Sequence, residues 1–178
     1  SDDFHGTDGP IIARRFKREE WLPAQQTFYN ACRAAGYSES PDLNNPDSTG
    51  ISPTPYNNPN GIRWSTAIGY LGQSRHRLNL TIRPNCTVHR IVFDGNRATA
   101  VEVESGGERF TVEGEEIVLS GGAIASPQLL MLSGVGPADQ LQSLGIPVVH
   151  ELPGVGQNLR DHPIIFLTWR TKEGFELD

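Results

Sequence analysis

The chain has 178 residues, of which 37% are hydrophobic and 8% aromatic, and this is enough apolar material for a packed core. A net charge of −6 and a pI near 5.3 disfavour a nucleic-acid partner, because phosphate binding requires a basic surface. No apolar run approaches the ~20 residues that a membrane-spanning helix needs, and the acidic, polar N-terminus does not resemble a signal peptide. We therefore expect a cytoplasmic protein, or one associated peripherally with a membrane.

The two cysteines, Cys32 and Cys86, lie far apart in the sequence and form no CxxC motif. This spacing disfavours both a disulfide framework and a metal site. We predict free thiols in a reducing compartment, with packing favoured over a reactive role.

The first half of the chain predicts one helix, from about residue 21 to residue 35. Pro23 is tolerated in its first turn, and Gly36 is placed to end it. A core-facing stripe is expected at apolar residues with helical spacing, namely Trp21, Phe28, Cys32 and Ala35.

Residues 37–62 are dense in proline, asparagine, serine, glycine and aspartate, and predict a long irregular loop. Such a loop is either functional or a covering flap. A short helix capped by Ser65 or Thr66 should follow it.

The centre of the chain predicts an antiparallel β-meander. Strands are expected at residues 78–82, 87–93, 98–104 and 109–112. Turns at residues 94–96 and 105–107, both with glycine, join the last three of these strands.

Residues 116–119 form a short apolar run that is typical of a strand buried on both faces. Two glycines and a helix from about residue 126 to residue 132 follow, which makes half of a βαβ unit. Further strands are expected at residues 146–149, limited to a sheet edge by their proline, and at residues 164–169. This mixture predicts an α+β or α/β fold and excludes all-α and all-β classes.

Glycines 121 and 122 would let a ligand approach the backbone closely after the buried strand. Ser126 is placed to cap the following helix, with Pro127 at its first position. The free N–H groups at such a helix start attract anionic or polar ligand groups. An ordinary strand–turn–helix junction uses the same residues, so these residues alone favour a ligand site and a structural junction equally.

Residues 152–163 contain a second glycine-rich segment. It begins like GxGxxG, but Leu159 stands where the third glycine belongs, so it fails as a dinucleotide fingerprint. Asn158, Asp161 and His162 form a polar cluster within it. Adjacent residues seldom pair as a catalytic base and its orienting group, so hydrogen bonding within a tight loop is favoured over a catalytic role.

Two long motifs carry a resemblance to a known family. Residues 122–136 read GAIASPQLLMLSGVG and resemble the second signature of the glucose–methanol–choline (GMC) oxidoreductases. Residues 153–162 read PGVGQNLRDH and resemble the family's PGVG-x-NL-x-DH block, at the proper separation. The similarity spans nearly the whole chain and is closest to choline-dehydrogenase-like members.

The resemblance implies part of an FAD-binding, Rossmann-like domain with an antiparallel β-meander, together with part of a substrate domain. Residues 1–76 would belong to the substrate or cap region, residues 77–145 to the FAD-binding domain, and residues 146–178 to a flavin-adjacent loop and the start of the substrate domain. In family members the valine segment lies beside the adenine, the glycine turn passes the adenosine end, and the second block lies near the isoalloxazine or the pyrophosphate. The implied FAD contacts are Thr87, Val88, Ser120, Gly121, Gly122, Ala123, Asn158, Leu159, Asp161 and His162.

Two parts of the family's machinery have no match in this sequence: the GxGxxG turn and the catalytic histidine that takes the alcohol proton. We expect no catalytic residue and no metal ligand among the histidines, which are His5, His76, His89, His150 and His162. The chain thus resembles an internal segment of an FAD-dependent alcohol dehydrogenase or oxidase that moves a hydride from a CH–OH donor to the flavin. Alone, it should be inactive, bind FAD weakly or not at all, and self-associate through an uncovered sheet edge.

Two other functions stay open at this point. A lyase of the same family would use the same fold and FAD without net oxidation, and a stand-alone module would have no enzymatic role. The sequence names neither the small alcohol substrate nor the electron acceptor, which is oxygen or a quinone.

Overall fold

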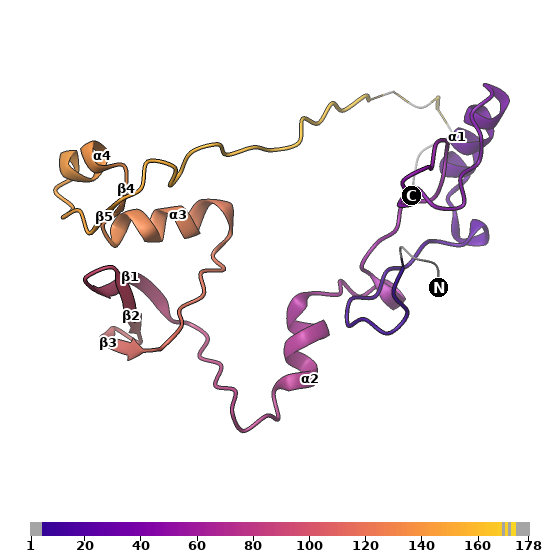
Figure 1. Ribbon diagram of the computed structural model, residues 1–178. Coiled ribbons are helices and arrows are strands. Elements are labelled where there is room, and N and C mark those ends of the chain that lie inside the picture. The colour runs from indigo at the N-terminus through magenta and orange to yellow at the C-terminus, as the bar shows by residue number, and fades with distance from the viewer. Residues whose placement is uncertain (1–4, 169, 171, 174–178) are drawn as a thin grey trace. The chain divides into compact units, whose positions relative to one another are not determined.

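The computed structural model describes residues 5–168, 170, 172 and 173. The chain forms two compact units, one of Ser1–Thr81 with Trp169–Asp178 and the other of Ile82–Thr168. In the described residues, the first unit holds short helices and loops, and the second holds the strands β1–β5 with helices α3 and α4 (Figure 1). This mixture of helix and strand is that of an α/β protein, as predicted.

The predicted first helix is confirmed as α1, Pro23–Ala34, with Pro23 at its start and Gly36 in a left-handed conformation (φ +94°) after its end. The predicted stripe is wrong in part, because Phe28 is 67% exposed and Tyr29 is the buried residue of α1. Tyr29 packs edge-on against Trp21, with ring centroids 5.2 Å apart. Trp21 precedes the helix, so the 3.6-residue period does not extend to it.

The loop prediction for residues 37–62 is also confirmed. Isolated bridges join Glu39 to Ile51 and Tyr56 to Arg14, and the loop's one regular element in the described residues is the 3₁₀-helix η2, Pro59–Gly61. The short helix that follows consists of a π-helical turn, Ala67–Leu71, and α2, Gly72–Ser74. The Ser65 hydroxyl accepts a hydrogen bond from the Ile68 N–H at 3.4 Å, as expected of a helix cap.

The β-meander is confirmed as an antiparallel sheet of β1 (Thr87–Asp94), β2 (Arg97–Ser105) and β3 (Glu108–Glu113) in that order. Both turns have the predicted glycine chemistry. Gly95 has positive φ at the first central position of the first turn, and Gly106 and Gly107 both have positive φ in the second. The strand predicted at residues 78–82 is wrong: Leu78 is fully exposed, and this segment pairs with no described strand.

Helix α3, Gly122–Leu132, begins four residues before the predicted start at residue 126. The prediction that Ser126 caps it and Pro127 opens it is therefore wrong, because both residues lie inside the helix. Gly122 has φ +85°, which lets the chain turn into the helix directly after residue 121. Pro127 lies little more than one turn in, so its missing N–H removes one hydrogen bond near the helix start.

Three predicted strands are not formed where the pattern placed them. Residues 116–119 lie outside any strand, and Val118 is 82% exposed. The reason is that no described strand lies beside this segment to pair with its backbone. Residues 164–168 also form no strand, and Trp169 lies outside the described residues. The strand predicted at 146–149 is displaced to β5, His150–Glu151, which pairs in parallel with β4, Val135–Gly136.

Within the second unit, α3 lies between the meander on one side and the small β4–β5 sheet with α4 (Ala138–Ser143) on the other (Figure 1). The chain leaves α3 through Gly134, which has φ +85°. A Cβ atom at this position would lie 2.4 Å from the Pro147 carbonyl oxygen. Only glycine therefore allows the segment before β5 to approach the backbone at residue 134. This approach lets the Val149 N–H donate a hydrogen bond to the Gly134 carbonyl at 2.8 Å.

Gly134→Ala is expected to lower the free energy of unfolding by about 3 kcal/mol, because left-handed strain of ~1–2 kcal/mol adds to an overpacking cost of ~1–3 kcal/mol. Gly145→Ala is the matched control, since Gly145 also has positive φ (+70°) but its added methyl meets no atom within 4 Å. Urea denaturation of the two variants measures the difference. Equal losses would show that the contact with Pro147 contributes nothing.

Candidate cofactor site

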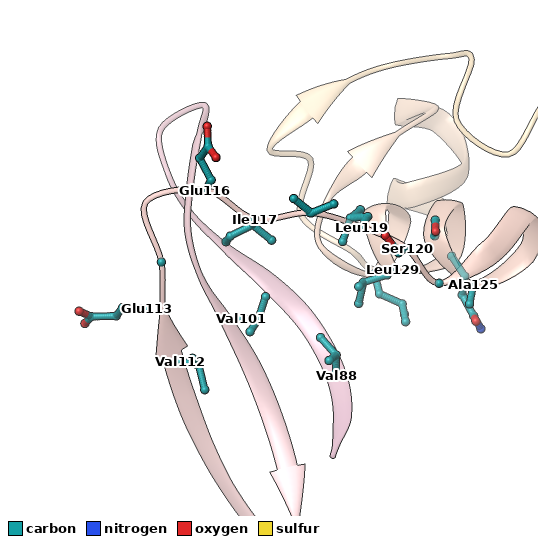
Figure 2. A pocket seen from close by; sticks show the side chains of 16 residues that line it. Val88, Val101, Val112, Glu113, Glu116, Ile117, Leu119, Ser120, Ala125 and Leu129 are labelled. Atoms are coloured by element: carbon teal, nitrogen blue, oxygen red, sulfur yellow. The ribbon is translucent and has the colours of Figure 1, made fainter. Parts of the chain in front are cut away.

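A groove of about 550 Å³ separates the meander from α3. We name it the valine groove, since Val88, Val101 and Val112 form its sheet wall. Figure 2 shows these valines on the strands, with Ala125 and Leu129 on α3 across from them. The apolar walls and the volume are those of a small-molecule pocket, for which ~300–1,000 Å³ is usual.

The segment after β3 forms the remaining wall of the valine groove. Glu116, Ile117 and Leu119 line this side, and Glu116 is exposed (Figure 2). Glu113, the last residue of β3, pairs with Ala100, and its carboxylate points away from the groove. The segment then reaches Ser120 and the glycine turn, which line the groove beside the start of α3. The groove thus combines an apolar interior, one exposed carboxylate at its edge, and backbone donors at a helix start.

A second groove of about 830 Å³ lies on the other side of α3. We name it the loop groove, because residues 154–160 of the second glycine-rich segment form the wall across from α3. Gln128 and Ser126 line both grooves, so α3 is their shared wall. In the loop, Val155 is buried, whereas Asn158 adopts a left-handed conformation with φ +58° and is exposed.

Met131 brings the two sequence motifs together. A Cβ atom at Gly136 would lie 2.9 Å from the Met131 Cγ, and one at Gly156 would lie 3.5 Å from its Cε. The methionine side chain therefore packs against a glycine of each motif. This contact explains why the GMC-like signature and the PGVG block, separate in sequence, form one structure.

The predicted cofactor residues divide between the grooves. Val88, Ser120 and Gly121 line the valine groove, and Ala123, Asn158 and Leu159 line the loop groove. Thr87, Gly122, Asp161 and His162 line neither. Sequence reasoning missed Val101, Val112 and Leu129, although the period-two alternation of the predicted strands places the two valines on one face of the sheet.

The Asp161–His162 pair makes a local backbone contact. The His162 N–H donates to the Asp161 Oδ1 at 2.8 Å, and both residues are exposed. Such bonds between an aspartate side chain and a neighbouring backbone amide are common in tight loops. Within the described ranges, no three histidine, cysteine, aspartate or glutamate side chains gather as a metal site would require.

The face of the meander away from the valine groove carries charged side chains, and a β-bulge in β1 places His89 and Arg90 together on it. His89 has no partner residue on β2, because the register shifts between Val88 and Arg90. His89 and Arg90 therefore lie on the same side, where the His89 Nε2 is 3.0 Å from the Glu104 Oε2 and the Arg90 Nε donates to Glu102 at 3.1 Å.

Together, these features define a mixed α/β protein whose glycine turn opens onto a ligand-sized apolar groove. The chain belongs to the GMC oxidoreductase family, whose model matches residues 7–164. It is 43% identical over 178 residues to an oxygen-dependent choline dehydrogenase of Chromohalobacter salexigens, a match that covers 99% of this chain and 32% of that protein. The chain thus spans about a third of the length of the curated relatives it matches.

Solved structures show the same similarity. The crystal structure of pyridoxine 4-oxidase from Mesorbium loti superposes with a TM-score of 0.78 at 32% identity, over 84% of this chain and 29% of that one. An FAD-dependent oxidoreductase from Chaetomium thermophilum gives 0.76 at 28% identity, over 84% and 26% of the two chains. None of the helices in the described part of the chain combines the length and apolarity that crossing a membrane requires.

Hydrogen bonds from Arg109 and then His89 lower the pKa of the Glu104 carboxyl, because they stabilise its charged form. A folded-state pKa below the unfolded one gives stability that is present above the unfolded pKa and is lost as the pH falls through the folded pKa. Arg109→Gln should therefore raise the Glu104 pKa toward its ordinary value. Arg90→Gln, which removes the neighbouring partner of Glu102, should leave it low. NMR titration of the Glu104 carboxyl carbon measures both, and an unchanged pKa in Arg109→Gln would contradict this assignment.

Proposed function

We propose that the protein containing this chain oxidises a small alcohol by hydride transfer to FAD, and that the valine groove holds the adenosine part of the cofactor. The observation that carries the proposal is the groove itself: the family's adenine-side segment at Val88 and its glycine turn at Gly121 line one cavity. FAD, when bound, supplies the hydride acceptor. Membership of the GMC oxidoreductases supports this reaction class.

The residues of the valine groove suit an adenosine group. Gly121 has no side chain and lines the groove, so a ligand can approach its backbone closely. Helix α3 has free N–H groups in its first turn, which act as donors to a ligand's polar atoms. The flat base would pack on the valine side chains, while the Glu116 carboxylate at the edge of the groove would accept a hydrogen bond from a hydroxyl or amino group.

The same proposal assigns the domains. Residues 77–145 would belong to a Rossmann-like FAD domain, residues 1–76 to the substrate or cap region, and residues 146–178 to the flavin-adjacent loop and the start of the substrate domain. Residues 116–119 would then pair, as a buried parallel strand, with strands from other parts of the whole protein. In the chain alone this unpaired edge would favour self-association.

The loop groove would lie toward the flavin end of the cofactor. Its motif residues Asn158 and Leu159 face the same space as Ala123 of α3. Asp161 and His162 line neither groove, so they would contact the cofactor from the exposed side of that loop. A relative named for choline oxidation and a structural neighbour named for pyridoxine oxidation support a small alcohol as substrate, with choline the first to test.

Filling the valine groove tests this function. In the whole protein, Ala125→Phe places a ring in the groove from α3 and should raise the Kd for FAD by about tenfold or more, because ~1.4 kcal/mol of lost contact is a factor of ten. Gln142→Phe adds the same ring on exposed α4, away from both grooves, and should bind FAD normally. Flavin fluorescence titration of the apoprotein measures each Kd. Normal FAD binding by Ala125→Phe would refute the placement of adenosine.

The 178-residue chain produced alone should bind FAD weakly or not at all and should not oxidise choline. The reason is that its sequence contains neither a GxGxxG phosphate turn nor the family's catalytic histidine motif. Absorbance at flavin wavelengths after dialysis with FAD, compared with the whole protein, provides the measurement. A yellow chain with stoichiometric flavin would contradict this expectation.

A further inference from the structure

We propose that Ser133 is a positioning residue for the cofactor: its hydroxyl joins α3 to β1 and so fixes the width of the valine groove. This inference rests on the proposed function, because it assumes that the valine groove holds adenosine. Ser133 directly follows α3 and is 7% exposed. Ser133 is not among the residues that the family motifs predict to contact FAD.

The Ser133 hydroxyl makes two hydrogen bonds. It accepts from the Ile91 N–H of β1 at 2.8 Å and donates to the Leu129 carbonyl of α3 at 2.6 Å. Ile91 is 5% exposed, so its N–H has no access to water if the serine is lost. Among the described strands β1 is an edge strand, and Ser133 therefore satisfies an amide on the edge that faces α3.

Both partners of Ser133 lie on elements that form walls of the valine groove. The Leu129 side chain lines the helix wall, and Ile91 lies three residues after Val88, which lines the sheet wall (Figure 2). The groove-lining residues Val88 of β1 and Leu129 and Leu132 of α3 are apolar, and apolar contacts are non-directional and tolerate sliding. A buried hydrogen bond is directional, so it fixes the position of the helix along the strand.

A serine at a helix end often only bonds back to a carbonyl in the preceding turn. Ser143 is such a residue in this chain: its hydroxyl donates to the Gln140 carbonyl at 2.8 Å at the end of α4, it is exposed, and it lines neither groove. Ser143→Ala is therefore the matched control for Ser133→Ala. The two variants lose the same kind of helix-end contact, but only Ser133→Ala breaks the link between helix and strand.

The experiment measures ligand binding to the whole apoprotein, with FAD and with two fragments of it. ADP carries the adenosine without the flavin, and FMN carries the flavin without the adenosine. Ser133→Ala should weaken FAD and ADP binding by about tenfold each and leave FMN binding unchanged. A tenfold loss corresponds to ~1.4 kcal/mol, which lies within the usual cost of leaving a buried amide without a hydrogen bond. Ser133→Thr retains the hydroxyl and should restore FAD binding, and Ser143→Ala should bind all three ligands normally.

Two results would overturn the positioning role: normal ADP and FAD binding by Ser133→Ala, or equal losses for ADP and FMN, which would indicate general loosening. If Ser133→Ala does not fold, Ser133→Cys fills the same space with a weaker donor and acceptor and replaces it in the same comparison. The Ala125→Phe variant separates the two proposals. If Ala125→Phe binds FAD normally, the placement of adenosine in the valine groove fails; if only Ser133→Ala does, the positioning role alone fails.

Discussion

Both grooves of the second unit share one wall, helix α3, so the arrangement of the candidate site depends on how that helix is held. On the meander side, the buried Ser133 hydroxyl bonds the Ile91 N–H. On the other side, Met131 packs against the backbone at Gly136 and Gly156. A directional hydrogen bond thus fixes one side, and close packing against glycine fixes the other. Since packed interiors resist small displacements, these contacts determine the shape of both cavities.

The SGVG part of the signature has a separate physical role at each position. Ser133 links helix and strand, Gly134 adopts a left-handed conformation beneath the Pro147 carbonyl, Val135 is buried, and Gly136 makes room for Met131. None of these roles requires contact with a ligand. The SGVG part therefore holds α3 in place. The groove-lining residues are others: Ala125 and Leu129 earlier in the signature, the valines on the strands, and Gly121 in the glycine turn.

Sequence reasoning succeeded where structure is decided locally. The meander was predicted because Gly95, Gly106 and Gly107 carry their own turn chemistry. It failed at residues 78–82 and 116–119, because a strand also needs a partner, and apolar alternation does not say whether one is present. It misplaced the start of α3, because the positive φ of Gly122 lets the helix begin before the expected Ser–Pro cap. The candidate site was found in part: Val88, Ser120 and Gly121 of the groove were predicted, and Val101 and Val112 were not.

The bulge at His89 connects the charged and apolar faces of the meander. Without an extra residue, strict alternation would place Val88 and Arg90 on one face and His89 and Ile91 on the other. The unpaired His89 shifts the register, so Val88 pairs with Val103 and Ile91 with Val101, all on the apolar face. Val88 can then line the groove while Ile91 is buried beside Ser133. One inserted residue thus lets Val88 join the sheet wall of the candidate cofactor site while Ile91 keeps the strand position to which α3 is attached.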